Sequence, residues 1–109
     1  MRFLVINADD LGLAPGVNRG IFEAHAAGTL SSASMMVSCP AFGEAAEQAL
    51  RDAPELSVGL HLNLVSGMPL AAVPSLVDAE THRFHPLDVL DSALTAWRAG
   101  AFQINTWTV

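Results

Sequence analysis

Strand-like and helix-like segments alternate through the first two-thirds of the chain, and this order constrains the fold most. Short apolar or alternating runs predict strands, whereas apolar residues three and four apart predict helices. Strands are predicted over residues 2–8, 30–38 and 57–65, with one helix from Pro15 until Gly28 ends it and another over 42–52. Strands joined through helices in this order are expected to be parallel, with right-handed crossovers. The sequence therefore predicts an α/β fold.

The last third is less regular. Residues 66–86 form a proline-bearing loop, residues 87–99 are spaced as a helix, and residues 100–109 have strand-like composition without a recognisable partner. A long loop after the carboxyl end of a strand is often functional. With 109 residues, the chain is long enough for one compact domain with a modest core.

Charge and composition exclude several classes of protein. The net charge is −6, lysine is absent and the five arginines are scattered, which argues against a nucleic-acid surface. No stretch approaches the roughly 20 apolar residues of a membrane span, and the run over 3–6 is too short for a signal-peptide core, so we expect a cytoplasmic protein. The single cysteine, Cys39, excludes an internal disulfide framework.

Two adjacent carboxylates, Asp9 and Asp10, stand where the first predicted strand stops. In α/β proteins, ligands collect at the carboxyl ends of parallel strands. Two like charges side by side also cost energy unless a cation, a proton or water offsets it. For an isolated pair, a solvated turn in which an aspartate caps the next helix is the favoured interpretation.

His61 strengthens the interpretation as a site. In the third predicted strand it shares a face with Gly59 and Asn63, opposite the leucines, and in a barrel that polar face would point inward. Carboxylate and imidazole ligands suit Zn²⁺, Mn²⁺ or Mg²⁺. Two protein ligands alone would make a weak site.

Several separated blocks then carry a family resemblance, in the right order and spacing between residues 2 and 76. The blocks, taken together, resemble the YdjC-like carbohydrate deacetylases; they are Asn7–Ile21, Ala24-His25, Ser32–Val37 and Val58–Leu64. The resemblance implies a (β/α) TIM-like barrel of the polysaccharide-deacetylase type. It also implies a hydrolase that removes the acetyl group from N-acetylated sugars, typically chito-oligosaccharides, with one divalent cation, Mg²⁺ or Zn²⁺.

Carried over residue by residue, the resemblance makes Asp10 and His61 metal ligands and Asp9 the catalytic base. The family's third ligand is a histidine further downstream, and nothing in residues 87–109 matches it. A complete barrel needs about 250 residues. We therefore expect residues 1–109 to form a single truncated domain with weak or no activity, in which residues 100–109 do not match the family. His82 and His85, in a loop that reads as solvated, are not expected to replace the missing ligand.

Two other classes of protein share parts of this pattern. A phosphoacceptor receiver domain also has an acidic pair after its first strand, but it requires an aspartate after the third strand and a later lysine, and this chain has neither. A noncatalytic remnant that acts only by association remains as the alternative. Open sheet edges favour homo-oligomerisation in that case.

Overall fold

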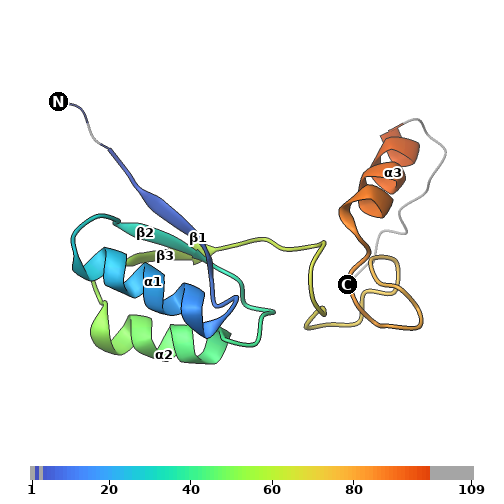
Figure 1. Ribbon diagram of the computed structural model, residues 1–109. Coiled ribbons are helices and arrows are strands. Elements are labelled where there is room, and N and C mark those ends of the chain that lie inside the picture. The colour runs from blue at the N-terminus through green and yellow to red at the C-terminus, as the bar shows by residue number, and fades with distance from the viewer. Residues whose placement is uncertain (1, 3, 99–109) are drawn as a thin grey trace, which may run out of the picture. The chain divides into compact units, whose positions relative to one another are not determined.

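The structure is a computed structural model that describes residues 2 and 4–98 (Figure 1). Its elements, in chain order, are β1 (Asn7–Leu11), α1 (Pro15–Ala26), β2 (Ser32–Met35), α2 (Phe42–Asp52), β3 (Ser57–Leu60) and α3 (Leu87–Arg98). The chain divides into two compact units, one up to Asn63 and one from Leu64 onward, and each is described by itself.

The first unit is an open parallel sheet with the strand order β1-β2-β3. Asn7 pairs with Ser32, and Ser32 pairs in turn with Ser57, so the three strands start level with one another. Both helices of this unit cover the same face of the sheet (Figure 1). The expected α/β fold with parallel strands is confirmed.

Alternation along β2 separates the core from the opposite face of the sheet. Ala33 and Met35 are buried on the side that carries the helices, whereas Ser32 and Ser34 are only half-buried on the other side. The buried apolar side chains form one cluster between sheet and helices; its members are Leu11, Ile21, Phe22, Ala33, Met35, Ala45, Ala53 and Leu56. The polar face of the sheet is thus the one that neither helix of this unit covers.

Local chemistry sets the helix ends. Pro15 opens α1, where a missing N–H costs nothing, and Gly28 ends it with a φ of 74°. Gly28 N–H donates to the carbonyl of His25, and Thr29 N–H donates to that of Ala24, which together form a Schellman cap. The second helix, α2, has the bounds that the sequence predicted.

The strands differ from the prediction at their ends. The first, expected over 2–8, is β1 at Asn7–Leu11, so Asp9 and Asp10 lie inside the strand and not after it. Leu4 and Val5 are 84% and 71% exposed, because β2 begins only at Ser32 and gives them no partner. The other two strands are likewise shorter than expected, since pairing, and not composition, decides where a strand ends. β3 stops at Leu60, although the N–H of His61 still donates to the carbonyl of Met35.

The second unit contains a turned loop and α3. An isolated antiparallel bridge joins Val77 to Phe84, and Asp78 closes the turn between them through its backbone and side chain. The expected helix over 87–99 is found as α3, which ends at Arg98. The segment 100–109 lies outside the described residues. None of the helices in the described part of the chain has the length and apolar character needed to cross a bilayer.

Candidate metal and catalytic site

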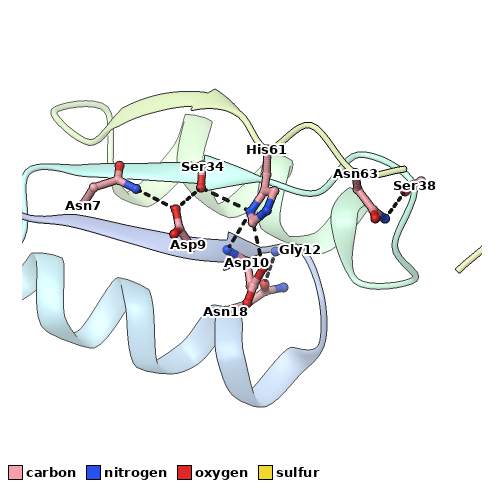
Figure 2. Close-up of polar contacts among 9 residues, drawn as sticks. All are labelled: Asn7, Asp9, Asp10, Gly12, Asn18, Ser34, Ser38, His61 and Asn63. Carbon is pink, nitrogen blue, oxygen red and sulfur yellow. Dashed lines mark hydrogen bonds and ion pairs between the residues drawn. The ribbon is translucent and has the colours of Figure 1, made fainter. Parts of the chain in front are cut away.

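A bulge in β1 brings two neighbouring carboxylates to one side of the sheet. Ala8 pairs with Ala33 and Leu11 with Met35, so β1 has one residue more than β2 between these pairs. Within this bulge, Asp10 adopts a left-handed backbone conformation with a φ of 67°. In a regular strand Asp9 and Asp10 would point to opposite faces. Here both reach the polar face, where they lie beside Ser34 and His61 (Figure 2).

This backbone conformation is unfavourable by itself. A left-handed conformation costs a residue with a Cβ about 1–2 kcal/mol, although aspartate adopts it more readily than most residues. Such strain persists only where surrounding structure imposes it, and it is concentrated at functional sites. The strained position coincides with one of the two carboxylates that the sequence singled out.

Asn18 holds the chain that follows the bulge. Its side chain is fully buried in α1; Oδ1 accepts the N–H of Gly12 at 2.7 Å, and Nδ2 donates to the carbonyl of Ala41 at 3.1 Å (Figure 2). The loop after β1 is thus tied to the loop before α2. The sequence leaves open whether Asn18 stabilises the start of the helix or approaches the acidic turn, and the structure shows the contact with the turn. Asn18 stands three and four residues before Ile21 and Phe22, on the face of α1 that is buried.

Gly12 is required by its surroundings. Its φ is 93°, and an added Cβ would lie 3.1 Å from the carbonyl oxygen of Met36 and 3.2 Å from Cα of Phe42. Both of these contacts are backbone atoms that cannot rotate away. The turn after the two aspartates is therefore shaped for close approach of two loops.

Asp10 and His61 meet at the carboxyl ends of β1 and β3. Oδ1 of Asp10 lies 3.3 Å from Nδ1 of His61, and the N–H of Asp10 makes a long 3.4 Å hydrogen bond to the same nitrogen. The side chain of His61 is 29% exposed and that of Asp10 46% exposed, so both side chains are partly accessible to solvent.

Asp9 has different partners. Its Oδ1 accepts a hydrogen bond from Nδ2 of Asn7 at 2.9 Å and one from Oγ of Ser34 at 2.5 Å (Figure 2). The hydroxyl of Ser34 is also 3.4 Å from Nδ1 of His61. Neither Asn7 nor Ser34 was singled out from the sequence. The signal for Ser34 was its place on the polar face of β2, between the strands that carry the other site residues.

The chemistry of the donor pair fits a shared cation. Two ligands at the usual zinc distances in a tetrahedral site lie roughly 3.4 Å apart, close to the Asp10–His61 separation. Within the described residues, however, no group of three His, Cys, Asp or Glu side chains could hold a metal ion. His82 and His85 belong to the second unit. If Asp10 and His61 held a cation, water would have to fill its other positions.

A groove in the first unit lies away from these residues. It has a volume of about 760 Å³, is lined by α1 and α2 residues such as Arg19, His25 and Glu44, and contains none of the site residues. The candidate site is therefore defined by its side-chain donor atoms.

Comparison with known proteins shows the family of the chain. The family model described as YdjC-like protein matches residues 3–102. This chain belongs to the YdjC-like family. The resemblance seen in the sequence is thereby confirmed, and the match continues beyond residue 76.

Relatives in this YdjC-like family include named deacetylases. A carbohydrate deacetylase from Geobacillus stearothermophilus is 51% identical over 77 residues, covering 71% of this chain and 31% of that protein. A chitooligosaccharide deacetylase from Yersinia enterocolitica is 46% identical over 79 residues, covering 72% of this chain and 31% of that protein. The chain spans about a third of the length of these relatives.

A solved structure agrees with the fold. The crystal structure of a proposed cellobiose-phosphate cleavage protein from Enterococcus faecalis V583 superposes with a TM-score of 0.75 at 40% identity, covering 81% of this chain and 35% of that one. The parallel α/β arrangement of this chain therefore matches part of a YdjC-like structure.

Proposed function

We propose that this chain carries part of the active site of a metal-dependent deacetylase that acts on N-acetylated sugars of the chito-oligosaccharide type. Asp10 and His61 are ligands of one divalent cation, Mg²⁺ or Zn²⁺, and Asp9 is the general base. The observation that carries the proposal is the 3.3 Å approach of Asp10 Oδ1 to His61 Nδ1, with Asp9 beside them on the polar face. The deacetylase relatives supply the substrate class.

Each residue has a separate task. A divalent cation bound by Asp10 and His61 would polarise the acetamide carbonyl and lower the pKa of a water molecule. Asp9 accepts the proton of the water that attacks this carbonyl. Expulsion of the sugar amine then requires a proton, and Asp9, having just acquired one, can return it. Acetate and the free amino sugar are the products.

Zinc titration by calorimetry tests the ligand assignment without requiring turnover. We expect Asp10→Asn and His61→Ala each to weaken Zn²⁺ binding, while His25→Ala and Asp52→Asn serve as matched controls. His25 is held by the carbonyl of Leu30 in the same unit, and Asp52 pairs with Arg51 at the surface. Zinc affinity that is unchanged in both site variants would remove these ligands from the proposal.

Acetate release from N,N′-diacetylchitobiose with added Mg²⁺ or Zn²⁺ tests the chemistry. We expect weak release, because the described residues provide only two ligands. Any release should be abolished by Asp9→Asn and retained in Asp52→Asn. Robust turnover that survives Asp9→Asn would contradict the role of Asp9 as base.

Association without catalysis is a second candidate, favoured by an apolar groove. The groove has a volume of about 430 Å³, lies between α2 and the strands β2 and β3, and carries Leu50, which is 84% exposed. Exposed apolar surface of this kind favours contact with another copy of the chain. Sedimentation equilibrium distinguishes the candidates, since Leu50→Gln should dissociate an oligomer formed through this groove and leave Zn²⁺ affinity unchanged.

A further inference from the structure

The two oxygens of the Asp9 carboxylate are treated differently by the protein. Asn7 and Ser34 both donate hydrogen bonds to Oδ1, at 2.9 Å and 2.5 Å. A carboxylate oxygen has about two lone-pair positions, so these two donors saturate Oδ1. Within the described residues, both hydrogen bonds to this carboxylate are made to Oδ1 and neither to Oδ2. The geometry thus distinguishes one oxygen held by the protein from one left open.

Ser34 is placed for this task by the sheet. It lies on the polar face of β2, directly opposite Gly59 of β3 in the register. Nothing lies within 4 Å of the position that a Cβ on Gly59 would occupy, so the space beside Ser34 is open on that side. The hydroxyl reaches across to β1, which is why a residue 25 positions away in the sequence contacts Asp9.

A role for Ser34 as a nucleophile fits the geometry less well. In a serine–histidine–carboxylate triad, the serine and the carboxylate contact different nitrogens of the imidazole ring. Here Ser34 Oγ and Asp10 Oδ1 both approach Nδ1 of His61, at 3.4 Å and 3.3 Å. The single hydroxyl proton also lies on the much shorter contact, toward Asp9.

We propose that Ser34 is a positioning residue for Asp9: it keeps Oδ1 occupied and leaves Oδ2 as the oxygen that meets water and substrate. The importance of this orientation for the reaction rests on the proposed function, in which Asp9 is the base. The orientation of the carboxylate does not depend on the proposed function, because it follows from the hydrogen bonds alone. Asn7, also in β1, donates the second of these hydrogen bonds.

The orientation is measurable by NMR on the labelled chain. Three-bond couplings from Cγ of Asp9 to the backbone report its χ1 rotamer. We expect one rotamer in the wild type and in Ser34→Thr, which keeps the hydroxyl, but averaging over rotamers in Ser34→Ala. Ser32→Ala, on the same strand and face, is the matched control and should retain the single rotamer. A single unchanged rotamer in Ser34→Ala would overturn the proposal.

Kinetics separate this proposal from the proposed function. We expect Ser34→Ala to lower kcat for acetate release about tenfold, the loss typical of one hydrogen bond to a charged group. KM and Zn²⁺ affinity should stay unchanged in this variant. Ser34→Thr, which keeps the hydroxyl, should have the wild-type rate. If Asp9→Asn retains turnover while Ser34→Ala still averages the rotamer, the role of Asp9 as base fails and the orientation by Ser34 stands. Where turnover is too slow to follow, the couplings decide alone.

Discussion

Oδ1 of Asp10 lies 3.3 Å from Nδ1 of His61, although the two residues are 51 positions apart in the chain. Three parallel strands make this contact, because β2 holds β1 and β3 in a common register. The bulge in β1 then turns Asp10 to the face on which His61 lies. The contact therefore depends on pairing between strands as much as on the two side chains.

The strain at Asp10 can be measured by comparing two substitutions that both remove the carboxylate. Because φ is 67°, Asp10→Gly should be more stable than Asp10→Ala by about 1–2 kcal/mol. Urea unfolding of the two variants gives the difference directly. Equal stabilities would mean that the left-handed conformation at Asp10 imposes no cost.

Asn18→Ala should destabilise the first unit by about 2–3 kcal/mol, because it leaves the buried N–H of Gly12 and the carbonyl of Ala41 without their partner. The exposed neighbour Arg19→Ala serves as the control and should change the free energy of unfolding little. Urea unfolding measures both. Similar values for the two variants would contradict the role of Asn18 in tying the loops together.

Two glycine substitutions should have opposite effects. Gly12→Ala should destabilise by about 1–2 kcal/mol or more, because it adds the cost of a positive φ to a close contact with backbone atoms. Gly20→Ala, in the middle of α1 with nothing near the added Cβ, should stabilise by up to about 1 kcal/mol. Thermal unfolding of both variants checks the signs, and destabilisation of similar size in both would refute this account of Gly12.

The turn of the second unit has a predictable pH dependence. The backbone N–H of Thr81, followed by its hydroxyl, lowers the pKa of Asp78 below its ordinary value of 3.8. Because the pKa is depressed in the folded state, the stabilisation is fully present above the unfolded pKa and is lost as the pH falls through the folded pKa. NMR titration of Asp78 should show a pKa below 3.8, which rises in Thr81→Ala. Because Thr81→Ala keeps the backbone N–H, an Asp78 pKa that is the same in both proteins would exclude the Thr81 hydroxyl as a cause.

Much of the fold could be predicted from local signals. Pro15 and Gly28 bracket α1, and an alanine-rich run that ends before Pro54 defines α2, so the ends of both helices are set by residues close to them in the sequence. The ends of the strands are not set locally. Leu4 and Val5 have the composition of a strand, but whether they form one depends on a neighbour that β2 does not provide, since it begins only at Ser32.

The site could be predicted only in part. Asp9, Asp10 and His61 were recognisable because polar residues at strand ends are conspicuous in the sequence. The bulge at Asp10 was not, since it exists only relative to the pairing of Ala8 and Leu11 with β2. The same holds for Ser34, whose contact with Asp9 is created by the register between two strands.

The central claim is that Asp10 and His61 bind one divalent cation through Oδ1 and Nδ1. Long-range ¹H–¹⁵N NMR of the histidine rings during Zn²⁺ titration tests it most directly, because it separates the two ring nitrogens of each histidine. We predict that the shift change of His61 is larger at Nδ1 than at Nε2 and that Asp10→Asn weakens it, while the ring nitrogens of His25 stay unchanged. A larger change at Nε2 of His61, or a response that Asp10→Asn leaves intact, would contradict the claim.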